Sequence, residues 1–176
     1  MEIVQINEKK QIVDKVRFGG IFNIVCRDKN GNIKWEDTAK NLVTNVGLQH
    51  ILDVVFSGGT AVGTWYVGLT DGTPTVAAGD TLASHTGWVE VTAYADNRKA
   101  YVEVRSSQTL TNTASKASFA INADSTTIGG AFLCSVATTT TGTLMCAAAF
   151  TGGDKAADDG DTLDVTYTFT AGDDGA

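Results

Sequence analysis

Much of the chain alternates apolar and polar residues, which is the two-residue period of a half-buried β-strand. The most regular stretch lies near the end, where Leu163, Val165, Tyr167 and Phe169 are separated by aspartate or threonine. We predict further strands at 21–27, 33–36, 65–69, 88–94, 100–105 and 117–122. One buried face and one wet face are typical of antiparallel sheets. The pattern therefore predicts a mainly β fold, a single antiparallel β-sandwich or barrel-like domain.

One segment, at about residues 45–56, has a helical period instead. Its apolar residues follow i, i+3, i+4, i+7 and i+8 spacing along one stripe: Leu48, Ile51, Leu52, Val55 and Phe56. Thr44 or Asn45 can cap the start through a side-chain oxygen, and Ser57-Gly58-Gly59 can end the helix. We expect one short α-helix whose apolar stripe covers an opening or a face of the sheet.

Four segments resemble sequences of small virion proteins of tailed bacteriophages. They are a predicted hairpin at 28–35, the Asn-Leu-Val-Thr-Asn-Val-Gly-Leu motif at 41–48, the hydrophobic strand at 65–69 and the last strand at 160–169. In the hairpin, Asn30-Gly31 is a pair favoured in type I′ turns, which need positive φ at both central positions. In the phage proteins a strand pair leads through such a motif into a short helix, and a hydrophobic strand follows.

This resemblance implies a structural component of a bacteriophage particle. The expected role is capsid decoration, as a cement protein bound to the shell of the major capsid protein. A tail, collar or fibre-base component is the alternative. The implied partners are the major capsid protein or other virion proteins, and we expect a homo-oligomer. The implied location is the virion, assembled in the cytoplasm of the bacterial host.

Charge and composition narrow the function classes. The 176 residues carry a net charge of −7, with +1 on residues 1–55 and −8 on residues 56–176. An acidic body argues against nucleic-acid binding, because phosphate contacts need clustered lysine and arginine. No apolar run is long enough to span a bilayer, so we expect no membrane partner. The first residues lack the basic and apolar regions of a signal peptide, which predicts a cytoplasmic start.

The N-terminal segment differs from the rest of the chain in the spacing of its apolar residues. Residues 1–17 carry six β-branched aliphatic residues whose spacing suits neither an amphipathic helix nor a half-buried strand. Two readings remain open: an arm that becomes ordered only against a neighbour, or an edge strand of the domain. Residues 18–176 form the predicted β-sandwich domain, without an internal repeat or a linker.

A hairpin between residues 128 and 150 allows a prediction of register. If it is centred on Thr140, then Cys134 lies opposite Cys146, and Phe132 lies opposite Ala148. Large residues would then face small ones on one shared apolar face. We expect Cys134 and Cys146 to stay reduced, and all three cysteines of the chain to be buried thiols.

No catalytic constellation stands out, and we predict that the protein is not an enzyme. His50 lies three residues before Asp53 on the predicted helix, and His85 follows Ser84 in a loop. A hydrolase would need a serine, a histidine and an acid brought together with an oxyanion hole. No nucleophile-elbow or phosphate-loop motif is present. We therefore assign no catalytic and no cofactor-binding residues, and expect no cofactor.

Two weaker patterns suggest binding sites. Aspartates at 154, 158, 159, 161 and 164 offer hard oxygen ligands for calcium, but their spacing misses the EF-hand loop, and a solvated acidic turn is favoured. We therefore assign no metal ligands. Trp35, Trp65, Tyr66 and Trp88 could form a sugar platform, although core or rim positions are commoner. An exposed cluster of these aromatics would favour a carbohydrate- or receptor-binding β-module as the second function class.

Overall fold

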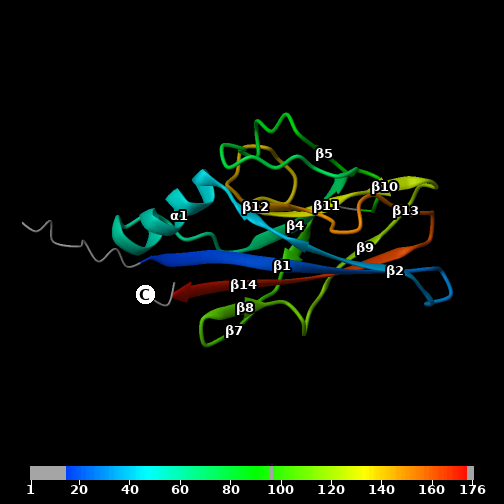
Figure 1. Cartoon of the computed structure of the whole chain (residues 1–176), viewed down its shortest axis with the longest axis horizontal. Coiled ribbons are helices and arrows are strands. Elements are labelled where there is room, and N and C mark those ends of the chain that lie inside the picture. The colour runs from blue at the N-terminus through cyan, green and yellow to red at the C-terminus, as the bar shows by residue number, and fades with distance from the viewer. Residues whose placement is uncertain (1–14, 96, 174–176) are drawn as a thin grey trace, which may run out of the picture.

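Two six-stranded antiparallel sheets face each other, residues 126–128 and 155–157 form a separate two-stranded sheet, and one short helix lies at one end of the molecule (Figure 1). This computed structural model describes residues 15–95 and 97–173. The predicted mainly β, antiparallel sandwich with a single short helix is confirmed. In chain order the elements are β1 (Val16–Arg27), β2 (Ile33–Lys40), β3 (Leu42–Val43), α1 (Asn45–Phe56), β4 (Trp65–Asp71), β5 (Val89–Glu90), β6 (Lys99–Tyr101), β7 (Val104–Ser106), β8 (Thr109–Thr111), β9 (Ala117–Ala120), β10 (Thr126–Ile128), β11 (Gly130–Cys134), β12 (Leu144–Ala149), β13 (Lys155–Ala157) and β14 (Thr162–Asp173).

The first sheet, called the outer sheet here, has the order β2-β1-β14-β8-β7, and β9 also pairs with β14. Its long central pair runs from Val16 opposite Asp173 to Arg27 opposite Thr162. The alternation predicted for β14 is confirmed, since its leucine, valine and tyrosine are fully buried. Between β9 and β8, the Asn112 side chain bonds the backbone of β14 in place of a strand.

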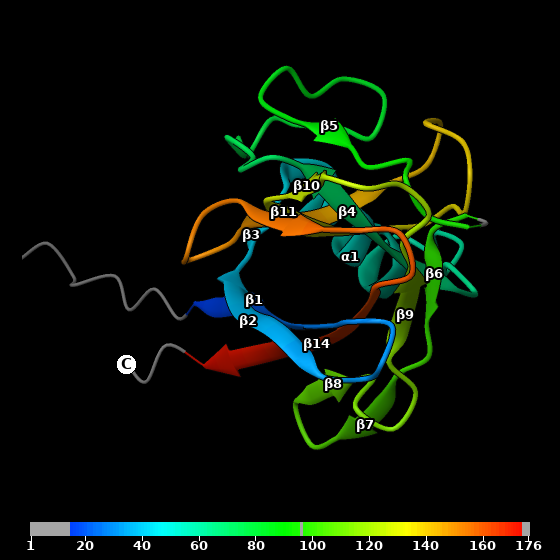
Figure 2. The same ribbon diagram turned by 90° about the vertical axis from the view of Figure 1, so that its right-hand side faces the viewer.

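The second sheet, called the inner sheet here, has the order β3-β12-β11-β4-β5, and β6 also pairs with β4. One of its faces packs against the outer sheet and forms the main core. The other face is covered by the segments that follow β4 and β11, which lie above it in Figure 2. These segments contribute Val76, Leu82, Trp88 and Val136 to a second apolar cluster. The inner sheet is therefore buried on both sides.

The chain crosses between the sheets within one predicted strand, so that prediction is wrong. Residues 100–105 divide into the end of β6, in the inner sheet, and the start of β7, in the outer sheet. Tyr101 is buried and donates its hydroxyl to the carbonyl of Tyr167 at 3.1 Å. Val102 and Val104 are 52% and 56% exposed. Only Val89 and Glu90 of the predicted strand at 88–94 form a strand.

The turn between β1 and β2 also differs from the prediction. Gly31 has φ +85°, but Asn30 does not adopt a positive φ, so the turn is not type I′. Instead Gly31 donates its N–H to the carbonyl of Asp28 at 2.9 Å. The Asp28 carboxylate accepts the N–H groups of Asn30 and Asn32 at 2.8 and 2.9 Å. This carboxylate fixes a three-residue loop, residues 29–31, which ends at the left-handed Gly31 and is closed by the bond from the Asp28 N–H to the carbonyl of Asn32 at 2.8 Å.

The predicted register of the β11–β12 hairpin is wrong. Leu133 lies opposite Cys146, and Cys134 lies opposite Leu144, with an irregularity between Leu133 and Cys134. A one-residue slip reverses which face each side chain takes. Cys146 therefore lies in the main core and Cys134 in the second cluster. The three thiols are free and buried, as predicted.

The helix and its cap are confirmed, but the predicted direction of its apolar stripe is wrong. The Thr44 hydroxyl accepts the N–H of Gly47 at 3.1 Å and donates to the carbonyl of Leu144 at 2.5 Å. Gly47 is the buried residue of α1, and a Cβ there would lie 2.5 Å from the carbonyl oxygen of Met145. Because the glycine lets the helix backbone approach β12 this closely, it sets the rotation of the helix. The apolar stripe consequently turns largely outward.

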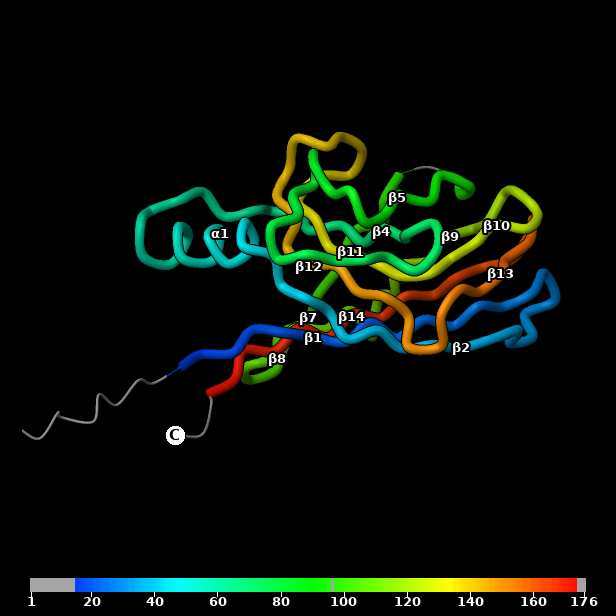
Figure 3. The backbone as a smooth tube through the Cα atoms, turned by 45° about the horizontal axis from the view of Figure 1, so that its top comes forward, coloured from blue at the N-terminus to red at the C-terminus, as the bar shows by residue number. Residues whose placement is uncertain are grey.

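The start of β1 lies at the same end of the molecule as α1 (Figures 1 and 3). Strand β1 begins at Val16, two residues before the predicted domain boundary, and pairs with β14 from that residue. Strand β2 joins it only from Ile21 onward. The predicted arm or edge strand at residues 1–17 therefore falls mostly outside the described residues.

Candidate functional site

An exposed apolar surface lies on the outward side of α1. Leu48 and Leu52 are 38% and 55% exposed, and Val55 and Phe56 are 63% and 79% exposed. Residues 41–70, which include the helix, contain a single formally charged residue, Asp53. These four exposed side chains and the cavity beside them are called the α1 surface below. Large exposed apolar patches are uncommon on monomeric proteins, so the α1 surface is a candidate contact surface.

The cavity beside α1 has a volume of about 250 Å³ and mostly apolar walls. Ile51 and Val54 line it from the helix, Trp65 and Leu133 from the inner sheet, and Leu110 and Phe169 from the outer sheet. It therefore lies where the two sheets diverge at the end of the sandwich. His50 packs edge-on to Trp65 in this cavity, with ring centroids 5.4 Å apart.

The apolar region continues from the cavity to the start of β1. Phe18 stacks on Phe169, with ring centroids 6.2 Å apart and an interplanar angle of 9°. Val16, two residues earlier, is 66% exposed. The α1 surface and the first residues of β1 are thus linked through the ring of Phe169.

The two histidines are not brought together into a catalytic group. His85 stacks on Trp88 with ring centroids 3.6 Å apart, and its Nδ1 lies 3.0 Å from the carbonyl oxygen of Trp88. His50 instead contacts Trp65 at the helix. Ser84 bonds through its backbone to Thr81. Each histidine therefore packs locally against a tryptophan.

The acidic turn is held by one basic side chain, that of Lys34. The Lys34 ammonium bonds the carboxylates of Asp158 and Asp161 at 2.9 and 2.5 Å. Hydrogen bonds from Lys34 and from the N–H of Ser125 hold the pKa of the Asp158 carboxyl below its usual range. The buried Asp161 carboxylate also accepts the N–H of Asp158. Within 15–95 and 97–173, no three or more His, Cys, Asp or Glu side chains converge as metal ligands would.

The four aromatic residues considered for sugar binding lie apart. Trp65 faces the main core from β4, whereas Tyr66, the next residue of that strand, faces the second cluster. Trp88 is only 6% exposed. The Trp35 indole packs on the main core and donates to the carbonyl of Ala156 at 2.8 Å. These side chains thus form no shared platform.

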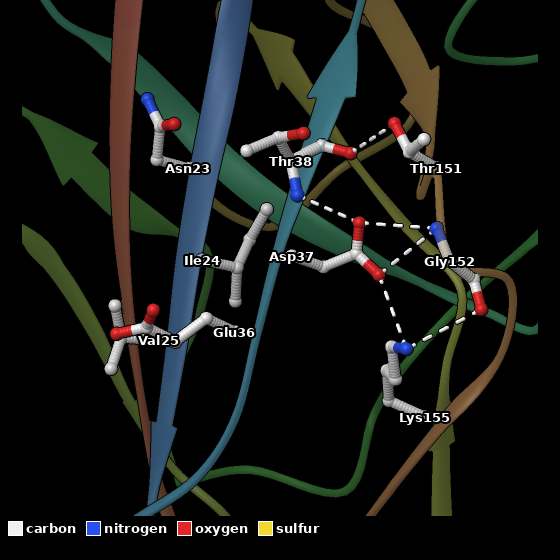
Figure 4. Close-up of a pocket in the computed structure, with 9 residues that line it drawn as sticks. All are labelled: Asn23, Ile24, Val25, Glu36, Asp37, Thr38, Thr151, Gly152 and Lys155. Atoms are coloured by element: carbon white, nitrogen blue, oxygen red, sulfur yellow. Dashed lines mark hydrogen bonds and ion pairs between the residues drawn. The ribbon is translucent and has the colours of Figure 1, made fainter.

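A larger pocket of about 530 Å³, lined by several polar and charged residues, lies beside β2 (Figure 4). Its Asp37 carboxylate accepts the N–H groups of Thr38 and Gly152 and pairs with the Lys155 ammonium at 3.3 Å. Burial alone would raise the pKa of this carboxyl, but those N–H groups and the ammonium hold it below its usual range. The network joins an edge strand of the outer sheet to the turn after β12 and leaves both charges paired with each other, so it serves structure.

Sequence reasoning missed the role of the buried Arg98. The Arg98 guanidinium makes a two-point ion pair with Glu90, at 2.8 and 2.7 Å, and donates to the carbonyls of Val136 and Thr139. It also lies over the Phe132 ring, 5.3 Å from the centroid. Arg98 thus holds the β11–β12 loop over the inner sheet. A single arginine in an irregular segment gave no pattern that marked this role.

Comparison with known proteins gives no relative: no protein-family model, no curated protein and no solved structure matches the chain. In the part of the chain that the structure describes, the only helical segment falls short of the length and apolarity that a membrane-crossing helix needs. The α1 surface is the best-founded candidate site, because it combines exposed apolar side chains with an adjoining cavity.

Proposed function

We propose that this protein is a structural component of a bacteriophage particle, most of all a capsid decoration protein that binds the shell of the major capsid protein. The observation that supports it is the α1 surface, where four large apolar side chains are exposed beside an apolar cavity. Surfaces depleted of charge and rich in apolar side chains are typical of the centres of protein contacts. The virion context comes from the resemblance of the motif at 41–48 and its neighbouring strands.

The size of the α1 surface fits attachment in many copies. Fully burying an aliphatic or aromatic side chain contributes roughly 1.5–3 kcal/mol. Association itself costs an estimated 4–15 kcal/mol or more, so four such side chains give a modest single-site affinity. On a lattice, linked copies bind together and raise the overall affinity without new contacts. A homo-oligomeric virion protein therefore suits this surface.

The test is rebinding to particles from which the protein has been removed. Leu52→Asp places a charge in the α1 surface, and Ile33→Asp is its matched control. Ile33 is 53% exposed, close to the 55% of Leu52, but it lies by the β1–β2 turn. We expect intact protein and Ile33→Asp to sediment with the particles and Leu52→Asp to remain free. Equal binding by both variants would contradict attachment through the α1 surface.

Copy number distinguishes the head from the tail. A decoration protein should be present in hundreds of copies in purified particles, and a tail, collar or fibre-base component in about a dozen. Quantitative mass spectrometry against the major capsid protein measures this ratio. Absence of the protein from purified particles would overturn the virion proposal as a whole.

Deletion of residues 1–14 tests the hypothesis that the N-terminal segment is an attachment arm. The deletion leaves β1 intact, since the strand begins at Val16. We expect the truncated protein to unfold cooperatively, as the intact protein does, but to lose binding to stripped particles. Circular dichroism melting and the sedimentation assay measure the two properties. Undiminished binding would show that the arm has no role in attachment, and loss of the folded state would favour the edge-strand reading.

A further inference from the structure

We propose that the cavity beside α1 receives one uncharged aromatic side chain of the major capsid protein, while the exposed side chains of α1 contact the surface around that side chain. This inference rests on the proposed function, because it names the chemistry of the partner group that the α1 surface binds. The cavity belongs to this chain alone, so its preference for an aromatic ring can be measured on purified protein.

The lining of the cavity includes both exposed and buried residues. Val55 is 63% exposed and Ala61 is exposed as well, so these two residues form its rim. Tyr101, Leu133 and Met145 are buried, so they form its floor. A side chain that enters past the rim is therefore taken out of water against walls that are already in place.

The volume of the cavity fits a six-membered ring. It measures about 250 Å³ and has mostly apolar walls. An apolar protein cavity of about 150 Å³ is large enough to bind benzene. The cavity beside α1 can thus take a ring together with the carbon that joins the ring to a backbone.

The walls favour an aromatic ring over an aliphatic chain. Trp65, Tyr101 and Phe169 present rings from three different strands. His50 adds a fourth ring from the helix. Rings that meet edge to face attract each other beyond the area that they bury. The thioether of Met145 adds a sulfur atom, which also makes favourable contacts with rings.

The walls also favour a ring without a charge. None of the described residues that line the cavity is an aspartate, glutamate, lysine or arginine. A charged group in the cavity would lose its water without gaining an ionic partner. The hydroxyl of Tyr101 is already donated to the carbonyl of Tyr167. The cavity is therefore suited to an uncharged aromatic side chain such as phenylalanine.

The position of the cavity connects it to the contact proposed for α1. Val55 both lines the cavity and belongs to the exposed apolar side chains of the helix. A partner surface that covers Leu52 and Val55 therefore also covers the rim of the cavity. In protein interfaces, a few well-buried residues in pockets, often aromatic, carry most of the binding energy, and the weaker contacts around them exclude water.

The first experiment measures the binding of toluene to the purified ¹⁵N-labelled full chain by NMR. Toluene carries the ring of phenylalanine, and benzoate is its charged counterpart. We expect toluene to shift the amide signals of Ile51 and Val54 in a saturable way. The signal of Gly31, in the turn at the far end of the molecule (Figure 1), should not move. Absence of a saturable shift with toluene, or an equal shift with benzoate, would overturn the proposal.

Two variants locate the binding of toluene. Ala61→Phe places a ring at the rim of the cavity, and Ala83→Phe is its matched control. Ala83 is also an exposed alanine in a loop, but it does not line the cavity. We expect Ala61→Phe to lose the saturable shift and Ala83→Phe to keep it, with both variants folded by their amide spectra. Equal binding of toluene by the two variants would place the site elsewhere and overturn the proposal.

A comparison of toluene with methylcyclohexane tests the preference for an aromatic ring. The two molecules have the same carbon skeleton, and their affinities are corrected for transfer from water to alkane. We expect the corrected affinity of toluene to be about 2- to 10-fold higher, because only toluene meets the surrounding rings edge to face. Equal corrected affinities would contradict the choice of an aromatic occupant.

The last experiment identifies the occupant on particles. In the sedimentation assay with stripped particles, Ala83→Phe should bind and Ala61→Phe should remain free. A photoreactive benzophenone group at Thr60, which is exposed next to Ala61, should cross-link to a segment of the major capsid protein that contains an aromatic residue. Replacing that residue by alanine in the shell should weaken binding about tenfold or more. A cross-linked segment without an aromatic residue, or full binding by Ala61→Phe, would overturn the named occupant.

Failure of this inference differs from failure of the proposed function. If toluene does not bind but Leu52→Asp abolishes rebinding, the cavity inference is wrong and attachment through α1 stands. If the protein is absent from purified particles, the proposed function and the named occupant are both wrong, whatever toluene does.

Discussion

The outer and inner sheets have similar numbers of strands but differ in how many of their faces are buried. In the outer sheet one face packs on the core, and the other is lined by threonines that pair across strands, such as Thr111 with Thr168 at 3.1 Å. In the inner sheet, every residue of β11 is buried, and so are the first five of β12. The alternation in the outer sheet therefore indicates which face is buried, whereas the two central strands of the inner sheet, β11 and β12, are apolar throughout.

The comparison shows when strand register is fixed by the hydrophobic pattern and when it is fixed by the fit between side chains. On a one-sided sheet, a slip of one residue would move the whole apolar set into water, so hydrophobicity alone fixes the register. On a two-sided sheet the same slip exchanges one apolar face for another. There the register depends on which large residue fits over which small one, as Phe132 fits over Gly68.

The largest expected effect is that of Phe132→Ala in the inner sheet. The ring is fully buried against Trp88, with centroids 5.1 Å apart, and lies under Arg98. Its removal leaves a cavity and should lower the free energy of unfolding by about 3–5 kcal/mol. Urea denaturation measures this change. A loss below about 1 kcal/mol would mean that the second cluster is loosely packed and that the inner sheet resembles a one-sided one.

Gly68→Ala should have the next largest effect. A Cβ at Gly68 would lie 2.2 Å from the Phe132 ring, which Trp88 holds in place. We expect a loss of about 1–3 kcal/mol in the free energy of unfolding from overpacking. Adding Phe132→Leu should restore part of the lost free energy of unfolding, because residues 68 and 132 pack against each other.

The matched control for this glycine lies in the outer sheet. A Cβ at Gly172 in β14 would meet nothing within 4 Å, so Gly172→Ala should be neutral or slightly stabilising. Similar losses at both positions would show that the effect comes from glycine in strands generally and not from two-sided packing.

The two faces of the inner sheet can also be compared at alkaline pH, because each face buries one thiol, that of Cys134 or that of Cys146. Burial raises the pKa of both Cys134 and Cys146, that of Cys146 to about 12. An unfolded thiol ionises near pH 8.5, so above that pH the folded state binds more protons than the unfolded state. The free energy of unfolding should then fall as pH rises, with Cys146 contributing about 1.4 kcal/mol per pH unit once the unfolded thiol is ionised.

Urea denaturation from about pH 8 to pH 10 measures this slope. Cys146→Ala should make it shallower, and an unchanged slope would contradict burial of that thiol. Mild oxidation should produce no Cys134–Cys146 disulfide in the folded protein, because the two side chains point to opposite faces. Formation of that disulfide would restore the register predicted from the sequence.

The smallest effect is expected on the wet face of the outer sheet. Thr170 is exposed, and its hydroxyl meets that of Thr109 at 3.4 Å. Thr170→Ala should change the free energy of unfolding by no more than about 0.5 kcal/mol. A loss several times larger would indicate that this face is covered in the protein as it exists in solution.

Structural features were predictable from the sequence where they depend on interactions between residues close together in the chain. The strand β14 and the capped helix α1 were predictable, because alternation and a threonine cap act between residues close in sequence. The two readings of residues 1–17 remain predictions. The pairing of Lys34 with Asp158 and Asp161 joins residues more than a hundred positions apart, and no local pattern marks it.

The sequence by itself determined that the chain forms antiparallel strands, one helix and three buried thiols, because solvent exposure and capping select these locally. The tertiary structure alone decided the register of β11 against β12 and the rotation of α1. Both involve a close approach that a glycine allows: Gly68 on β4 admits the ring of Phe132 and so fixes the face to which β11 turns that ring, and Gly47 admits the backbone of β12. That second contact turns Leu52, Val55 and Phe56 outward and so creates the α1 surface.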